Sequence, residues 1–260
     1  MTSNASSRRW EAAFWPLLIL TIFLFLWYAG VKWSGTKVFP SPMDVERGFE
    51  ELLRKGLLWK YMRDSLMRVG VGYGLAALCG IPLGLFLGWY PSAASTVNPV
   101  IQMMRPISPL AWIPLSIVWF GTSDLAAIFL IFLASFFPIV VSTSNGVRGI
   151  PAMYRQAGGN FGLAPVALLY RVVLPASLPQ ILVGLRIALG IAWLVVVAAE
   201  MIAVNSGLGY LIIDSRNAGK RYDLVVAGML LIGFIGLGLD LGVRRLENWK
   251  SVRWGFQHEG

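Results

Sequence analysis

The chain has 260 residues, of which 57% are hydrophobic and only 13% are charged. A soluble domain has about a quarter of its residues charged, so this balance indicates an integral membrane protein. One cysteine, Cys79, and one histidine, His258, exclude a disulfide framework, a Cys/His metal cluster and a His-dependent triad. The net charge of +9 fits basic residues beside membrane spans, so we expect no nucleic-acid partner and no metal.

Six apolar segments are long enough to cross a bilayer, which takes about 20 mostly apolar residues. They are residues 12–31, 66–89, 97–120, 124–143, 176–203 and 224–243. The first is longer than the apolar region of a signal peptide, so we expect it to be retained. The sequence therefore predicts an all-α integral membrane protein with about six transmembrane helices, forming a single domain over residues 1–260 in contact with membrane lipid.

Three polar connections separate these segments. Residues 43–65 place apolar side chains at helical spacing between charges, which fits either an amphipathic interfacial helix or a connector helix packed on the bundle. Residues 144–175 and 204–223 are the other two, and the latter is rich in the turn-forming residues Asn, Ser and Gly. The Lys and Arg residues of the connections and termini divide almost evenly between the two sides of the membrane when Arg68 is counted as a residue that flanks a span. Discounting residues 43–65, where acids offset the bases, favours cytoplasmic termini.

Two spans carry packing signals. Ala76, Gly80, Gly84 and Gly88 recur at every fourth residue, which predicts a face where another helix backbone approaches closely. In the third span, "RPISPLAWIP" (residues 105–114) contains three prolines, which remove backbone donors and break the helical ladder. Such a break is tolerated only where protein or a water-filled cavity satisfies the freed groups, so it suits a pathway lining.

Ionisable residues inside spans cost roughly 2.5 to 3.5 kcal/mol each and need a partner or a function. Arg186 and Glu200 lie roughly 21 Å apart along one helix and cannot pair within it, so each is expected either to pair with another helix or to face a pathway. Asp240 precedes Arg244 by one turn and fits a local ion pair. The candidates for the translocation pathway are Arg105, Ser108, Pro109, Trp112, Arg186 and Glu200.

The segment "RQAGGNFGLAPVALLYRVVLPASLP" (residues 155–179) resembles the cytoplasmic EAA loop of ABC importer permeases. The pattern of that loop is Glu-Ala-Ala, three residues, Gly, nine residues, Ile, one residue, Leu-Pro. Its positions fall here on Gln156, Ala157, Gly158, Gly162, Val172, Leu174 and Pro175. The departures are Gln for Glu, Gly for Ala and Val for Ile.

Further segments resemble permeases of the nitrate, sulfonate, taurine and bicarbonate group. These segments are "RPISPLAWIPLSIVWFG", "FPIVVSTSNGVRGIP", "LRIALGIAWLVVVAAEM" and "NSGLGYLI", and the likeness covers residues 60–250. The resemblance implies a type I importer permease fold with a cytoplasmic coupling loop at about 144–175. It implies a multi-pass protein of the bacterial cytoplasmic membrane that conducts one of these small anions and couples to a separate ATPase. Which anion is carried stays open.

The same resemblance assigns partners. Two cytoplasmic ATPase subunits would hold ATP and magnesium, because this chain contains no Walker A pattern. A periplasmic or lipoprotein solute-binding protein would dock on residues 32–65 and 204–223, and a second permease copy would complete a homodimer. The residues expected to contact the ATPase are Arg155, Gln156, Ala157, Gly158, Gly159, Asn160, Gly162, Leu174 and Pro175.

Local rules predict the shape of this coupling loop. Pro151 can start a short helix and Gly158 with Gly159 can end it, giving a projection of about two turns. Leu174 and Pro175 would then fix the point where the chain re-enters the membrane, because proline disfavours a helical conformation in the preceding residue.

Two other classes of function compete with the importer. An ion-coupled secondary transporter would use Glu200 to carry a proton, but it needs an internal inverted repeat, and the sequence shows none. A membrane-embedded enzyme is disfavoured because no His or Cys-His arrangement lies within a span.

Overall fold

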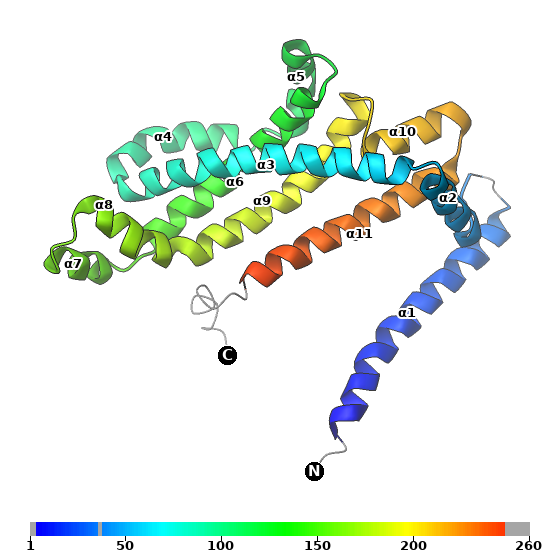
Figure 1. Cartoon of the computed structure of the whole chain (residues 1–260), viewed down its shortest axis with the longest axis horizontal. Coiled ribbons are helices and arrows are strands. Elements are labelled where there is room, and N and C mark those ends of the chain that lie inside the picture. Colours follow the sequence, from blue (N-terminus) through cyan, green and yellow to red (C-terminus); the bar gives the residue numbers. More distant parts are fainter. Residues whose placement is uncertain (1–3, 36–37, 248–260) are drawn as a thin grey trace. The chain divides into compact units, whose positions relative to one another are not determined.

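The computed structural model in Figure 1 describes residues 4–35 and 38–247. Every regular element among them is a helix, which confirms the all-α prediction. Five helices are long and apolar enough to cross a membrane, and they cover Leu17–Ser34, Leu57–Trp89, Asp124–Arg148, Pro165–Ile202 and Tyr222–Arg245. The described residues up to Trp59 form one compact unit with Leu211–Leu230, and Lys60–Tyr210 form the other with the described residues from Leu231 onward.

The first unit contains α1 (Asn4–Ser34), α2 (Pro42–Arg54) and parts of α10 (Leu208–Gly219) and α11 (Tyr222–Glu247). Helix α2 starts at a capping box, in which the Ser41 hydroxyl accepts from the Asp44 N–H and the Asp44 carboxylate accepts from the Ser41 N–H. It ends at Arg54, and Gly56 then turns the chain with a φ of 68°. The expectation of one helix over residues 43–65 was therefore wrong.

Helix α2 packs on the turn between α10 and α11. A Cβ atom on Gly48 would lie 3.3 Å from the Asp223 backbone, so the two segments approach closely. Arg221 Nη2 donates to Glu51 at 2.6 Å and to Asp223 at 2.7 Å. The hydrogen bond from Arg221, together with one from Lys55, lowers the pKa of Glu51 to about 2. The Glu51 carboxylate therefore stays ionised, and paired with Arg221, at neutral and mildly acidic pH. These contacts favour the connector-helix interpretation of α2.

The second unit begins within α3 (Leu57–Trp89), continues through α4 (Pro91–Met104) and then breaks. A short 3-10 helix, η1 (Pro109–Trp112), leads into α5 (Ile113–Phe120), which ends at Gly121 with a φ of 68°. The expectation of one continuous span over residues 97–120 was wrong. The physical reason is the one that the sequence supplied, because the prolines of this segment lack the N–H that a continuous ladder needs.

Helix α6 (Asp124–Arg148) lies in close contact with both α3 and α9 (Leu174–Ile202). On α3, a Cβ on Gly84 would lie 2.5 Å from Thr143 Cβ, and one on Gly88 would lie 2.5 Å from Val147 Cβ. On the other side, Gly184 of α9 faces Ser142, and a Cβ added to that glycine would collide with it. These approaches confirm the small-residue face predicted for α3.

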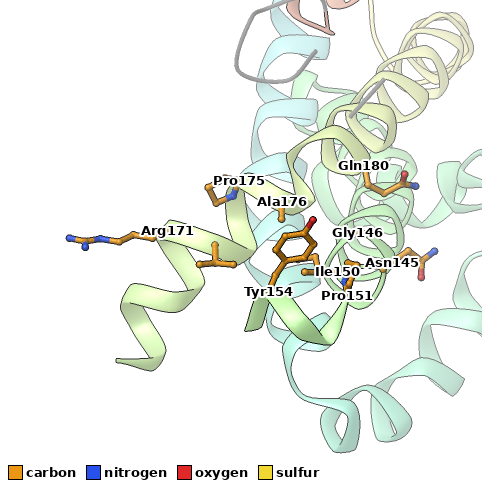
Figure 2. Close-up of a pocket in the computed structure, with 11 residues that line it drawn as sticks. Asn145, Gly146, Ile150, Pro151, Tyr154, Arg171, Pro175, Ala176 and Gln180 are labelled. Carbon is orange, nitrogen blue, oxygen red and sulfur yellow. The ribbon is translucent and has the colours of Figure 1, made fainter. Parts of the chain in front are cut away.

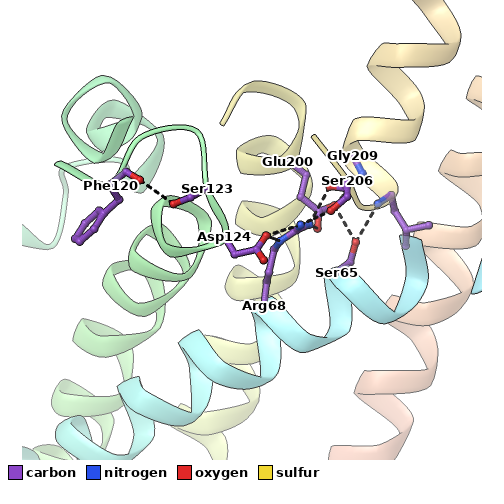
Figure 3. Close-up of polar contacts among 9 residues, drawn as sticks. Ser65, Arg68, Phe120, Ser123, Asp124, Glu200, Ser206 and Gly209 are labelled. Atoms are coloured by element: carbon purple, nitrogen blue, oxygen red, sulfur yellow. Dashed lines mark hydrogen bonds and ion pairs between the residues drawn. The ribbon is translucent and has the colours of Figure 1, made fainter. Parts of the chain in front are cut away.

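A polar cluster ties four segments of the second unit together (Figure 3). Arg68 of α3 is 2% exposed, and its Nη1 donates to Glu200 of α9 at 2.6 Å. Its Nη2 donates to Asp124 at the start of α6 at 2.7 Å, and both terminal nitrogens also reach Ser206 in the loop after α9. Arg68 thus has a partner in each of the three neighbouring segments.

Glu200 is held from the opposite side as well. Its Oε2 accepts from the Ser65 hydroxyl at 2.8 Å and from the Gly209 N–H at 3.0 Å. Gly207 lies so close that a Cβ there would collide with the Glu200 carboxylate, and its φ of 105° also requires glycine. Every oxygen of this buried carboxylate therefore has a donor, which is the condition under which a buried ion pair is tolerated.

We predict opposite effects for two glycines of α3. Gly84→Ala places a methyl group against α6 and is expected to destabilise the protein by about 1–3 kcal/mol. Gly74 has open space around it, so Gly74→Ala is expected to be neutral or stabilising, since alanine favours a helix by about 1 kcal/mol over glycine. Thermal unfolding of the purified protein measures both, and equal midpoints for the two variants would contradict the packing.

We also predict that Arg68→Met destabilises the protein by about 3–5 kcal/mol, because it leaves Glu200 charged and unpaired in a buried site. The matched control is Arg186→Met, which breaks a pair whose side chains are 32% and 36% exposed, and it is expected to cost about 1 kcal/mol or less. The double variant Arg68→Met/Glu200→Met should recover part of the loss. Chemical unfolding measures all three, and a loss from Arg68→Met no larger than that from Arg186→Met would disprove the role of the cluster.

Candidate functional site: the coupling loop and the pathway candidates

The coupling loop connects α6 to α9 through two short helices and one π-helical turn. Helix α7 (Ala152–Asn160) begins directly after Pro151, as predicted, and α8 (Pro165–Leu168) follows it. The expected end at Gly158 and Gly159 was wrong, because both glycines remain helical. The end is instead built on Gly162, which has a φ of 74°. The Gly162 N–H bonds to the Gly159 carbonyl and the Leu163 N–H to that of Gly158, the pattern of a Schellman cap.

Gly158 packs inside the loop itself. It is buried, and a Cβ at this position would collide with Leu168 of α8. Its small size therefore lets α7 rest on α8. The other predicted contact residues of α7 divide by exposure, with Arg155 half-buried and Gln156, Ala157, Gly159 and Asn160 exposed.

Large apolar side chains are exposed on the coupling loop. Phe161 is 86% exposed and Met153 is 65% exposed, and Tyr154, Val166 and Tyr170 are exposed beside them. The EAA pattern does not contain these residues, so the sequence analysis missed them. The signal was available, because an aromatic residue and a methionine inside a short polar connection have no span in which to bury themselves.

Leu174 and Pro175 do not interrupt the helix. The segment Pro165–Ile202 is continuous, and it passes through a π-helical turn at Leu169–Val173. The Leu174 N–H bonds to the carbonyl of Leu169, five residues back, and Leu174 keeps helical angles of −60° and −50°. The expectation that Pro175 disfavours a helical conformation at Leu174 was wrong, because the wider turn places Pro175 in the first turn of α9, where no N–H is needed.

A cavity of about 630 Å³ lies beside this turn, between the end of α6, α7 and the start of α9. Figure 2 shows the Tyr154 ring lying between the segment of Arg171 and Pro175 and the end of α6, while the Arg171 side chain points away. Asn145 and Gln180 supply amide groups to the lining. The coupling loop therefore combines exposed apolar side chains with a large open cavity.

The pathway candidates near the proline cluster lie close together in sequence and structure. Arg105 ends α4, and Ser108 caps η1 by accepting from the Leu110 N–H at 3.3 Å. Pro109 starts η1, and Trp112 ends it while packing partly buried against the main apolar core. This segment presents a broken backbone between two helical pieces, as its prolines predicted.

Arg186 and Glu200 lie in separate ion pairs. Arg186 donates to Asp240 of α11 at 2.9 Å, and Asp240 also pairs with Arg244 at 2.9 Å, as its spacing predicted. Glu200 belongs to the cluster around Arg68, so pairing with another helix is confirmed for both residues. That pairing also leaves the secondary-transporter hypothesis without a free carboxylate at Glu200. Within residues 4–35 and 38–247, no group of His, Cys, Asp and Glu could hold a metal.

Arg68 is another residue that the sequence analysis missed. It was counted with the basic residues that flank the second span, although it lies buried within α3. The available signal was a cation inside a candidate span together with a distant in-span glutamate, since each of the two needs a partner.

Three relatives are similar to this chain in sequence over most of its length. An archaeal protein of Methanocaldococcus jannaschii assigned to the ABC transporter permeases is 45% identical, and the match covers 78% of each chain. The taurine transport system permease of Escherichia coli is 35% identical over 88% of this chain and 85% of its own. The bicarbonate transport system permease of Synechococcus elongatus is 36% identical over 90% of this chain and 88% of its own.

The fold has a solved counterpart in an inward-facing structure of the MetNI methionine ABC transporter. That chain superposes with a TM-score of 0.64 at 18% identity, over 74% of this chain and 95% of its own, which confirms the predicted permease fold. The family model for binding-protein-dependent transport system inner membrane components matches residues 80–252. With relatives above 30% identity over most of its length, this chain belongs to that family of ABC importer permeases.

Proposed function

We propose that this chain forms the translocation pathway of an ATP-driven importer for a small anion, namely nitrate, taurine or another sulfonate, or bicarbonate. The permeases for taurine and bicarbonate among its relatives support this range of substrates. All of these solutes carry a compact oxyanion group, so one permease design serves them. The capture protein would make the finer choice among them.

The observation that carries this proposal is the exposed surface formed by α7 and its C-cap residue, Phe161. Phe161 and Met153 are apolar and largely exposed, although they lie in a polar connection outside the spans. A buried aromatic anchor at the centre of an interface typically dominates its binding energy, and Phe161 is placed to be one. The exposed Gln156, Ala157, Gly159 and Asn160 complete the face that would seat in the ATPase.

The coupling loop would transmit force because both of its ends continue into spans. Helix α7 follows α6 after three residues, and α8 continues into α9 without a break. A rigid-body shift of α7 on ATP-driven closure would therefore tilt α6 and α9 together and change access to the pathway. We place that pathway along Arg105, Ser108, Pro109 and Trp112, with the ion pairs of Arg186 and Glu200 fixing its walls.

The proposal assigns the remaining components to partner chains. Two ATPase subunits would bind ATP and magnesium, and a periplasmic or lipoprotein solute-binding protein would deliver the anion. A second copy of this chain would complete a homodimer around the pathway. The protein would lie in the cytoplasmic membrane with the coupling loop and both termini on the cytoplasmic side.

We predict that Phe161→Ser weakens the association with the ATPase subunit by about tenfold or more, because it removes an exposed aromatic anchor. Phe25→Ser is the matched control, since Phe25 is 68% exposed on α1, far in sequence from the coupling loop. The measurement is the amount of ATPase that co-purifies with tagged permease, together with solute-stimulated ATP hydrolysis. Equal loss in both variants would show that Phe161 has no specific role in docking.

The importer itself is tested in proteoliposomes that contain the permease, its co-purifying ATPase and the capture protein. We expect uptake of labelled taurine, nitrate or bicarbonate only when ATP is supplied on the side of the membrane where the ATPase lies. Uptake that instead follows a proton gradient and ignores ATP would contradict the proposed function.

A further inference from the structure

A second cavity lies between α4, α6 and the end of α3, and its lining is strongly polar. Its volume is about 230 Å³. The polar side chains that line it are Asn98, Gln102, Arg105, Ser144, Asn145 and Arg148. Ligand pockets for larger molecules measure about 300–1,000 Å³, so this cavity suits a small ion or a single charged group.

The cavity carries two positive charges and no negative one. Arg105 and Arg148 both line it, and no Asp or Glu is among its lining residues. Within the described part of the chain, neither guanidinium is paired with a carboxylate. Among residues 4–35 and 38–247, Arg148 donates only to the Leu87 carbonyl, at 3.4 Å. The guanidinium donors of both residues are therefore available to a ligand.

We propose that this cavity binds an oxyanion between Arg105 and Arg148. A guanidinium presents its N–H groups as a planar fork that matches two oxygens of a sulfonate, phosphate or carbonate group. The amide side chains of Asn98, Gln102 and Asn145 add neutral donors around the same space. Rings of Arg and Lys with such donors are a recurrent basis of anion selectivity in pores.

The position of the cavity is consistent with two sources of the bound anion. Asn145 and Arg148 belong to the last turn and a half of α6, immediately before Pro151 and α7, so the site lies at the coupling-loop end of the second unit. The first source is the transported anion itself, at its exit from the pathway, and this identification rests on the proposed function. The second is the phosphate of a lipid headgroup, since basic pockets between spans also bind such groups.

The binding arm of the test uses labelled sulfate and the intact permease–ATPase complex in a phosphate-free nonionic detergent. We expect saturable binding to the wild type, weakened about tenfold by Arg105→Gln and by Arg148→Gln, a loss of about 1.4 kcal/mol for each. Arg105→Lys keeps the charge and should recover part of the affinity. Arg171→Gln is the matched control, because it removes an exposed cation of the same unit that does not line this cavity.

The lipid arm counts the phospholipids that the wild type and the Arg105→Gln/Arg148→Gln variant retain, by native mass spectrometry. Weaker sulfate binding at an equal lipid count identifies a free oxyanion as the ligand. Fewer retained phospholipids in the variant, with sulfate bound by the wild type only after delipidation, identifies a headgroup phosphate. If sulfate binding and lipid count are the same in wild type and variants, or if Arg171→Gln weakens binding equally, the site is disproved.

ATP-dependent uptake of taurine, nitrate and bicarbonate by the wild type, measured in parallel, separates this inference from the proposed function. If the wild type takes up an anion and the arginine variants bind sulfate as well as the wild type does, the oxyanion site is refuted and the proposed function stands. Absence of uptake with arginine-dependent sulfate binding refutes the anion importer and leaves the oxyanion site established.

Discussion

The close approach of α6 to α3 and α9 is the constraint on which the rest of the second unit depends. Lipid gives two apolar helices little reason to associate, so contact area at short range must hold them. Gly84 and Gly88 let the α6 backbone come near on one side, and Gly184 does so on the other. The three helices consequently behave as one packed body. That body connects the coupling loop at one end of α6 with the Arg68 cluster at the other end.

The Arg68 cluster fixes the register of helix contacts that apolar packing alone does not fix. Apolar surfaces accept several registers at similar free energy, whereas one buried guanidinium with fixed partners accepts only one. Arg68 fixes α3, Asp124 fixes the start of α6, and Glu200 fixes the end of α9. Ser206 in the following loop and Gly209 at the start of α10 belong to the same arrangement. A buried charge thereby sets the register of three spans.

Local sequence patterns predicted the features that depend on one helix alone. The glycine face of α3, the break at the proline cluster and the start of α7 after Pro151 follow from the chemistry of single residues. What these local patterns did not predict are features set by a neighbour. Arg68 has its partner Glu200 132 residues away in the chain, and Gly158 is buried against Leu168 of α8.

The π-helical turn has a mechanical consequence for the way force enters the membrane. Because it carries Pro175 without a break, Pro165–Ile202 is one continuous helical segment of 38 residues, about 57 Å measured along the helix axis. A helical segment of that length would act as a lever, because a small rotation near its middle would displace each end by several ångströms. The fulcrum would lie where Gly184 meets α6. Helices commonly bend at π-helical turns, so the stroke of the ATPase would first be taken up as bending at Leu169–Val173.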